Sequence, residues 1–196
     1  MKTIWITGGS SGIGLATAKK FSKEKWRVII SSSNEIKLDN AIRILKNYTE
    51  NKEIYSIKCN IANRNEVHNT VTKIENNIAP INLALLNAAA YSPNKSQEFD
   101  IKNYEKLIDV NIKGTLYCIE ILEKFMKIRK NEHIAIVSSP VGYRGLPTAG
   151  AYGLTKAGLI NLAESLYFDL KKSFIKISVI NPGFIDSEST KMNTFP

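Results

Sequence analysis

A serine, a tyrosine and a lysine in the second half of the chain have the types and spacing that proton transfer at an oxygen atom requires. Tyr152 and Lys156 are four residues apart, and Ser139 lies thirteen residues before the tyrosine. The chain contains four Tyr-x-x-x-Lys pairs, but only this one has a hydroxyl side chain thirteen residues upstream. The three residues together are therefore more specific than the pair alone.

A carbonyl oxygen that becomes an alcohol needs a proton from a positioned acid, and the pKa of a free tyrosine is about 10. Residues four apart share a face of a helix. At about 5 Å and an effective dielectric constant of about 20, the Lys156 ammonium would attract a phenolate by roughly 3 kcal/mol, which predicts that the pKa of Tyr152 falls by about 2. Ser139 would then hold the substrate oxygen. An incidental tyrosine beside a solvated lysine explains this motif alone equally well.

A glycine-rich segment, TGGSSGIG, follows a short apolar run at the start of the chain and precedes apolar residues at helical spacing. A strand that leads through glycines into a helix is typical of dinucleotide binding. Gly8 would allow the tight turn, Gly12 would let the backbone approach a pyrophosphate, and Gly14 would let the helix pack closely on the sheet. Ser10 or Ser11 would cap the helix, whose first amides favour a phosphate. An ordinary glycine turn is the alternative.

The chain resembles the short-chain dehydrogenase/reductase family from residue 3 to about residue 187. Five segments carry the resemblance, in the order and at the distances that the family shows. They are TGGSSGIG from Thr7, LNAAA from Leu86, DVNIKG around Asn111, the trio of Ser139, Tyr152 and Lys156, and NPGFIDS from Asn181.

The resemblance implies an NAD(P)-dependent oxidoreductase that acts on a small carbonyl compound or secondary alcohol. Tyr152 would transfer the proton, Lys156 would tune it and bind the nicotinamide ribose, and Ser139 would position the oxygen; the family spacing favours Ser139 over Ser138. The main chain of Asn111 would hold a water of a proton relay, although this asparagine alone would be interpreted as a solvent-facing helix residue. A nucleotide-binding regulatory protein of the same fold, without turnover, is the alternative.

The resemblance also implies cofactor contacts, which lie mainly where predicted strands end. They are Gly8, Ser10, Ser11, Gly12, Ile13, Gly14, Ser32, Ser33, Asn60, Ile61, Asn87, Ala88, Ala89, Tyr152, Lys156, Pro182, Gly183, Ile185 and Ser187. Four positions depart from the family: Leu86 and Ala89 replace an asparagine and a glycine, Asn60 replaces an aspartate, and Ser187 replaces a threonine. The added methyl of Ala89 would crowd the adenosine ribose, whereas Asn60 can still accept a hydrogen bond from the adenine amino group.

The end of the second predicted strand bears on the choice of cofactor. An acidic residue there would bind a ribose 2′-hydroxyl and select NAD, whereas an arginine would suit the 2′-phosphate of NADP. Ser32 and Ser33 occupy these positions, and neither is charged. Their hydroxyl groups can bond a phosphate that no carboxylate repels, so the sequence favours NADP over NAD.

Apolar runs and helical patterns alternate along the 196 residues, which predicts a single α/β domain, residues 1–196, with a doubly wound parallel sheet. The predicted strands are 2–7, 26–31, 53–58, 81–87, 132–139 and 174–180, and the predicted helices are 12–24, 34–49, 63–77, 100–129 and 150–172. The resemblance implies the order 3-2-1-4-5-6. Family members usually continue to a seventh strand, for which the residues after Ser187 are too few. We therefore expect the strand 174–180 at the sheet edge, an open substrate side and loosely held final residues.

The formal net charge of +9 raises the question of nucleic-acid binding. The lysines are scattered without a basic-aromatic platform, so a solvated basic surface is favoured and no nucleic-acid partner is predicted. Cys59 and Cys118 are expected to be reduced core thiols, and His68 and His133 lack the spacing of metal ligands, so no metal is predicted. Met1 leads directly into the first strand and no apolar run spans a membrane, so we expect a cytoplasmic protein. The exposed edge strand indicates either a truncated form with impaired activity or a partner subunit that covers the edge, and we expect a homodimer or homotetramer.

Overall fold

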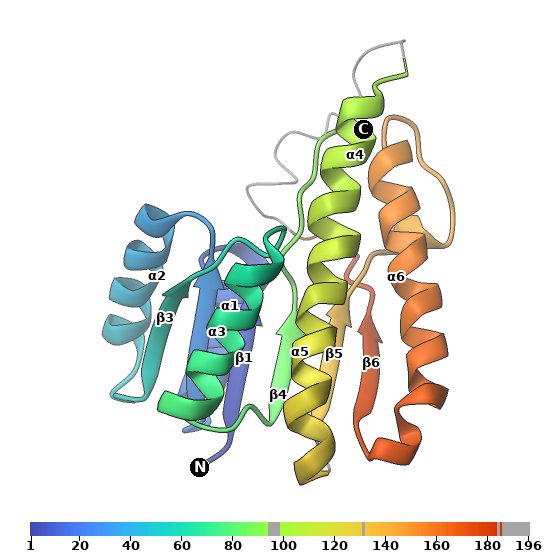
Figure 1. Ribbon diagram of the computed structural model, residues 1–196. Helices are drawn as coiled ribbons and strands as arrows, with labels where there is room; N and C mark the ends of the chain where they lie inside the picture. The colour runs from blue at the N-terminus through green and yellow to red at the C-terminus, as the bar shows by residue number, and fades with distance from the viewer. Residues whose placement is uncertain (94–98, 131, 184, 186–196) are drawn as a thin grey trace.

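The apolar runs of the sequence become strands, and every neighbouring pair of strands is parallel (Figure 1). The computed structural model describes residues 1–93, 99–130, 132–183 and 185. The strands are β1 (Thr3–Thr7), β2 (Arg27–Ser32), β3 (Ile54–Lys58), β4 (Leu83–Leu86), β5 (His133–Val137) and β6 (Lys176–Ile180). They form a six-stranded sheet in the order β3-β2-β1-β4-β5-β6, which confirms the predicted doubly wound arrangement.

Helices cover both faces of the sheet (Figure 1). They are α1 (Gly12–Lys23), α2 (Glu35–Tyr48), α3 (Arg64–Asn77), α4 (Ile101–Leu107), α5 (Gly114–Arg129) and α6 (Gly150–Asp169), with the short segments η1 (Ile108–Lys113), η2 (Pro140–Gly142) and η3 (Lys171–Ser173). One core, around Trp5 and Ile74, lies between the sheet and α3, α5 and α6. The other, around Ile6 and Leu45, lies between the sheet and α1 and α2.

Short polar side chains fix the start of three helices. Asn34, Asn63 and Asp100 each accept a hydrogen bond from a backbone amide in the first turn of α2, α3 and α4. Ser11 occupies the same position before α1, but in the described part of the chain its side chain makes no such bond. The predicted serine cap of α1 is therefore wrong, and the first amides of this helix keep their capacity to bind another acceptor.

The predicted helix 100–129 is interrupted near its middle. α4 continues into η1, which is a π-helical segment, and the α-helical pattern resumes as α5. Asn111 lies within η1 and is 0% exposed. A π-helical turn adds a residue to the usual turn and often marks a functional position. The solvent-facing interpretation of Asn111 is therefore wrong.

The connection between α6 and β6 is longer than predicted. α6 ends at Asp169, and Phe174 has a φ of 56°, which lies in the left-handed region. A residue in that conformation continues neither a helix nor a strand. β6 therefore begins at Lys176 instead of at residue 174.

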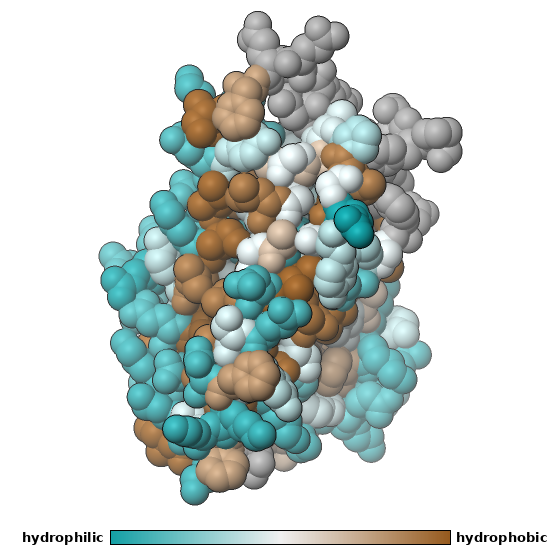
Figure 2. Space-filling view, turned by 90° about the vertical axis from the view of Figure 1, so that its right-hand side faces the viewer, coloured by the Kyte–Doolittle hydropathy of each residue, from teal (hydrophilic) through white to brown (hydrophobic). Residues whose placement is uncertain are grey.

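Within the described residues β6 is an edge strand, as predicted. Figure 2 shows apolar surface mixed with hydrophilic groups on the face that α6 and β6 form. The exposed large apolar side chains of these elements and their connection include Tyr167, Phe168, Phe174 and Ile180. Backbone groups on an edge strand with apolar neighbours favour pairing with a further strand.

The turn between β1 and α1 depends on glycine. Gly8 and Gly12 have φ values of 64° and 49°, which glycine adopts without strain. A Cβ atom on Gly14 would clash with the carbonyl oxygen of Gly8 and would lie 2.9 Å from Asn87 Nδ2. The first turn of α1 therefore packs on this loop without room for a methyl group.

Gly14→Ala should destabilise the protein by about 1–3 kcal/mol, because the methyl group must displace backbone atoms. Gly145→Ala is the matched control, since a Cβ atom there meets nothing within 4 Å. It should change the free energy of unfolding by less than about 1 kcal/mol. Urea unfolding followed by circular dichroism measures both values. Equal stability of the two variants would contradict the tight packing at Gly14.

Candidate active site

The predicted site residues gather at one edge of the sheet, because parallel strands all end on the same side. Asn111 lies on η1, and Tyr152 and Lys156 lie on α6. The other described positions end or follow the strands: Gly8, Ser10, Ser11, Gly12, Ile13 and Gly14 after β1; Ser32 and Ser33 at β2; Asn60 and Ile61 after β3; Asn87, Ala88 and Ala89 after β4; Ser139 after β5; Pro182, Gly183 and Ile185 after β6. Ser187 lies outside the described residues.

Thr7 and Asn87 tie the glycine-rich turn to the end of β4. Thr7 Oγ1 accepts hydrogen bonds from the backbone amides of Asn87 and Ala88, at 2.9 and 3.0 Å. In the other direction, Asn87 Nδ2 donates to the carbonyl oxygens of Thr7 and Gly8, at 3.0 and 3.2 Å. The side chain of Asn87 therefore shapes the turn, which is a role that the sequence did not reveal.

Two of the departures from the family pattern lie on opposite sides of this segment. Leu86 is 3% exposed and belongs to the core between the sheet and α3, α5 and α6. A polar side chain at this position would be buried among apolar groups, so leucine fits the end of β4 better than the asparagine of the family pattern would. Ala89 is exposed, so its methyl group does not press on the core.

The glycine-rich turn fits a dinucleotide pyrophosphate. Cβ atoms on Gly8 and Gly14 would collide with backbone, and one on Gly9 would lie 2.6 Å from Ile30 Cβ, so the loop is a narrow cradle of backbone atoms. The amides at the start of α1 have no side-chain cap from Ser11. Such amides, with the positive end of the helix dipole, bind phosphate groups.

The ends of β2 and β3 carry polar and charged groups that could face the adenosine half of such a cofactor. Ser32 lies opposite Lys58 in the strand register, and Lys58 Nζ forms an exposed ion pair with Glu35 at 3.2 Å. Asn60 Oδ1 accepts a hydrogen bond from the backbone amide of Ala62 at 3.1 Å. Asn60 therefore stabilises its own turn while one lone pair of the amide oxygen is left for another donor.

Tyr152 and Lys156 meet in the buried part of the site. Lys156 is 2% exposed, and its Nζ atom lies 5.4 Å from the ring centroid of Tyr152. The same ammonium donates a hydrogen bond to the carbonyl oxygen of Val137, at the end of β5, at 2.8 Å. The Lys156 ammonium is thus shielded from water and lies between the end of β5 and the ring of Tyr152.

Burial decides the charge states of this pair. It lowers the pKa of Lys156 to about 8, and it raises the pKa of Tyr152 to about 12, with a smaller contribution from Tyr91. The predicted fall in the pKa of Tyr152 is therefore wrong. The ammonium lies against the ring and bonds to Val137, so its attraction for a phenolate does not outweigh the loss of solvation.

Asn111 connects three parts of the site through its side-chain amide. Oδ1 accepts a hydrogen bond from Ala90 N at 2.7 Å, and Nδ2 donates to Ala90 O at 3.0 Å. Nδ2 also donates to Thr155 Oγ1 at 3.0 Å, and this hydroxyl donates to the carbonyl oxygen of Tyr152 at 2.8 Å. The loop after β4, the segment η1 and the helix α6 are thereby joined.

The two neighbouring serines after β5 have different surroundings. Ser138 is 2% exposed, and its Oγ atom donates to the carbonyl oxygen of Lys156 at 2.8 Å. Ser139 is only partly buried, and its Oγ atom accepts a long hydrogen bond of 3.4 Å from the amide of Val141. Ser138 fastens α6 to β5, whereas the hydroxyl of Ser139 still has a proton to donate.

The end of β6 reaches the same edge of the sheet. Asn181 Nδ2 donates a hydrogen bond to the hydroxyl of Tyr143, at 3.0 Å, and so links the end of β6 to the segment after η2. Pro182 and Gly183 follow directly, in the place that the resemblance assigns to the nicotinamide end of the cofactor.

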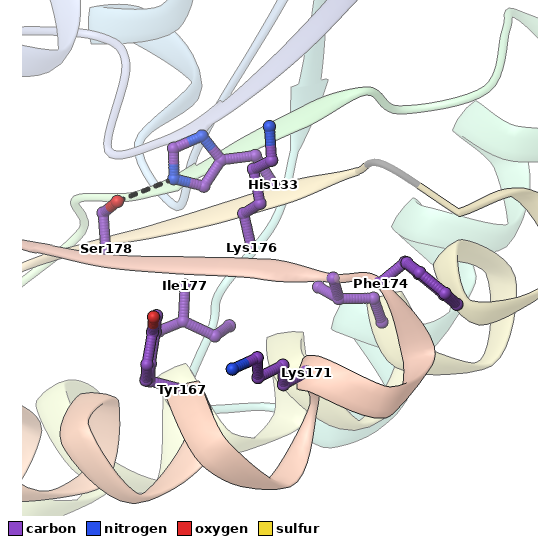
Figure 3. Close-up of a pocket in the computed structure, with 8 residues that line it drawn as sticks. His133, Tyr167, Lys171, Phe174, Lys176, Ile177 and Ser178 are labelled. Carbon is purple, nitrogen blue, oxygen red and sulfur yellow. Dashed lines mark hydrogen bonds between the residues drawn. The ribbon is translucent and has the colours of Figure 1, made fainter.

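A pocket of about 390 Å³ lies elsewhere, along the first residues of β6 (Figure 3). Its lining includes His133, Tyr167, Lys171 and Phe174. His133 Nε2 lies 2.9 Å from Ser178 Oγ, within hydrogen-bond distance. Figure 3 shows this pair on one side of the strand and Tyr167 and Lys171 on the other. The pocket lies beside the first residues of the edge strand β6. The catalytic candidates lie at the opposite edge of the sheet, where the strands end.

The sequence analysis assigned no role to three residues of the site. Thr155 joins Asn111 to the backbone of Tyr152, and Ser138 fastens the backbone of Lys156. Tyr91 packs its ring against that of Tyr152, with a centroid distance of 5.0 Å. The clue to Thr155 that the sequence offered was a hydroxyl residue directly before the lysine.

Two features are absent from the residues that the structure describes. These residues contain no group of three or more histidine, cysteine, aspartate or glutamate side chains that could hold a metal ion. Within the same ranges, every helix is too short or too polar to cross a membrane.

Known proteins share both the sequence and the fold. Residues 2–194 match the family model described as short chain dehydrogenase. The chain is 38% identical, over 196 residues, to 3-oxoacyl-(acyl-carrier-protein) reductase FabG of Rickettsia felis, and the match covers 98% of this chain and 76% of that protein. FabG of Rickettsia typhi is 35% identical over 193 residues, with the same two coverages.

A solved structure described as ElxO with NADP bound has a TM-score of 0.89 and 29% sequence identity, over 97% of this chain and 76% of that chain. The family match extends over almost the whole sequence, and the glycine turn and the Tyr152–Lys156 pair lie at the same edge of the sheet. The chain therefore belongs to the short-chain dehydrogenase family and is an NAD(P)-dependent oxidoreductase that acts on carbonyl or alcohol groups.

Proposed function

We propose that the protein reduces a carbonyl group with Tyr152 as the proton donor. Ser139 would donate a hydrogen bond to the carbonyl oxygen, and Lys156 would bind the nicotinamide ribose and return a proton to Tyr152. Asn111 would keep this arrangement in place and connect it to a water chain. Its carbonyl oxygen accepts a hydrogen bond from Thr115 Oγ1 at 2.8 Å.

The observation that carries this proposal is the burial of the Lys156 ammonium beside the ring of Tyr152. Removing a cation from water is unfavourable, so such a residue indicates a functional requirement. The raised pKa of Tyr152, about 12, keeps the phenol protonated. A protonated phenol can give a proton to the oxygen on which negative charge develops, as carbonyl reduction requires.

The cofactor would lie along the carboxyl edge of the sheet. The turn from Gly8 to Gly14 and the first amides of α1 would hold the pyrophosphate. The residues after β3 would contact the adenine, and those after β6 the nicotinamide end. When bound, the nicotinamide supplies the hydride, while the side chains named above orient the carbonyl group and provide the proton.

For the substrate, 3-oxoacyl thioesters are the first compounds to test, because the Rickettsia relatives are named as 3-oxoacyl-(acyl-carrier-protein) reductases. A panel of carbonyl compounds with NADPH and NADH separates this proposal from a nucleotide-binding protein without turnover. Binding of the cofactor with no reduction of any carbonyl compound would support the second function.

Tyr152→Phe should lower kcat by at least about 100-fold while the Kd for NADPH changes by less than about twofold. The variant loses only the hydroxyl group that donates the proton, and acid–base catalysis typically contributes about 100- to 10,000-fold. Steady-state kinetics and quenching of protein fluorescence by NADPH give the two quantities. Tyr55→Phe is the control, because it removes a tyrosine hydroxyl on β3, at the opposite side of the sheet from β5 and β6. More than about a tenth of wild-type activity in Tyr152→Phe would exclude Tyr152 as the donor.

Lys156→Met should abolish turnover and yet stabilise the fold at pH 7. The pKa of Lys156 is about 8 in the folded protein, below its ordinary 10.5, so the unfolded chain binds the proton more tightly. The buried charge then destabilises the fold by about 3 kcal/mol at pH 7, and this effect falls to about 1 kcal/mol at pH 10 and vanishes above pH 10.5. Urea unfolding of both proteins at pH 7 and pH 10 tests this difference. A variant that is less stable than wild type at pH 7 would show that the hydrogen bond to Val137 outweighs the burial of the charge.

NADPH should bind several-fold more tightly than NADH. Ser32 and Ser33 are uncharged, and Lys58 lies opposite Ser32, where it can exchange its exposed Glu35 partner for a 2′-phosphate. Ser33→Asp should reverse the preference by repelling the phosphate and binding the 2′-hydroxyl. Fluorescence titration with both nucleotides measures the four affinities. Tighter binding of NADH by the wild-type protein would refute the assignment.

A further inference from the structure

Tyr91 lies in the loop after β4, between two residues whose backbone is held by asparagine side chains. Ala90 exchanges two hydrogen bonds with the amide of Asn111, at 2.7 and 3.0 Å. Ser92 O accepts a hydrogen bond from Asn103 Nδ2, on α4, at 3.2 Å. The backbone on both sides of Tyr91 is thus fixed to the continuous helical segment formed by α4 and η1.

The side chain of Tyr91 meets the catalytic candidate directly. The rings of Tyr91 and Tyr152 have centroids 5.0 Å apart and an interplanar angle of 82°. This edge-to-face arrangement is a favoured geometry for aromatic pairs. The ring of Tyr152 is also contacted by the ammonium of Lys156, so two side chains from different parts of the fold define its position.

We propose that Tyr91 is a positioning residue, whose ring fixes the orientation of the Tyr152 phenol and closes one side of the site beside it. The inference rests on the proposed role of Tyr152 as proton donor. It adds a residue from the loop after β4 to a set that otherwise comes from η1, α6 and the segment after β5. Asn111 then has a second role besides its bond to Thr155, because its bonds to Ala90 also help to place the neighbouring Tyr91 ring.

The contact also bears on the charge state of Tyr152. Among the described residues, the titratable groups facing Tyr152 and the first turn of α6 are Lys156 on the same helix, Tyr91 after β4 and Tyr104 on α4, whose hydroxyl lies against Gly150. Burial is the main cause of the raised pKa of Tyr152, and repulsion from Tyr91 adds to it. Once Tyr91 is itself charged, its phenolate opposes the ionisation of Tyr152, and the ring contact holds Tyr152 in place in either charge state.

Three substitutions at this position separate the ring from the hydroxyl group. Tyr91→Leu and Tyr91→Met remove the ring, and each should lower kcat by about 10- to 100-fold, because a misplaced donor reacts slowly. Tyr91→Phe keeps the ring and should retain kcat within about threefold. The Kd for NADPH should stay within about twofold of wild type in all three. Tyr48→Phe, at an exposed position on α2, is the matched control.

A second measurement does not depend on turnover. In protein labelled with carbon-13 at tyrosine Cζ, the Tyr152 signal is identified by its absence from Tyr152→Phe. It should shift in Tyr91→Leu and Tyr91→Met through loss of the ring current. In Tyr91→Phe it should keep its chemical shift and titrate at lower pH than in the wild-type protein, because no phenolate of residue 91 remains to repel that of Tyr152.

Far-UV circular dichroism identifies any variant that fails to fold, and two variants without the ring are included for that reason. Wild-type kcat and an unshifted Tyr152 signal in a folded variant without the ring would overturn the inference. If the wild-type protein reduced no carbonyl compound, the proposed function would fail, and the Tyr152 signal would still decide whether Tyr91 positions that ring.

Discussion

The site depends on the burial of one ammonium group. Lys156 can lie out of water because Val137, at the end of β5, accepts its hydrogen bond. The backbone of the same lysine is fastened by Ser138, the next residue after that strand. α6 therefore cannot slide along β5 without breaking both contacts, and Tyr152, one turn earlier on the helix, is fixed by the same pair of bonds.

The loop after β4 joins this helix to the glycine-rich turn. β4 lies between β1 and β5 in the sheet, so its end is next to both. Asn87, directly after the strand, bonds to the backbone of the turn after β1, and Ala90, three residues later, bonds to Asn111. Asn111 in turn reaches α6 through Thr155. One short segment thus sets the distance between the proposed cofactor cradle and the proposed proton donor.

Desolvation, more than ion pairing, sets the charges at this site. The helical spacing of Tyr152 and Lys156 suggested that an ammonium would stabilise a phenolate. In the folded chain the ammonium is committed to a backbone carbonyl and lies against the ring, so both groups shift toward their neutral forms. A neutral phenol is an acid, and this agrees with carbonyl reduction in a family of NAD(P)-dependent oxidoreductases.

The sequence by itself determined the alternation of strands and helices, the glycines of the first turn and the spacing of Tyr152 and Lys156, because each is a local pattern of backbone preference or helix geometry. The π-helical segment around Asn111 and the uncapped start of α1 did not follow from it. The first depends on contacts far apart in the sequence, since Asn111 bonds to Ala90 and Thr155. The second depends on the orientation of the Ser11 side chain, which makes no hydrogen bond to the helix. The charge states and the placement of Tyr91 were likewise decided only by tertiary structure, since burial and ring contacts arise when β4, η1 and α6 pack together.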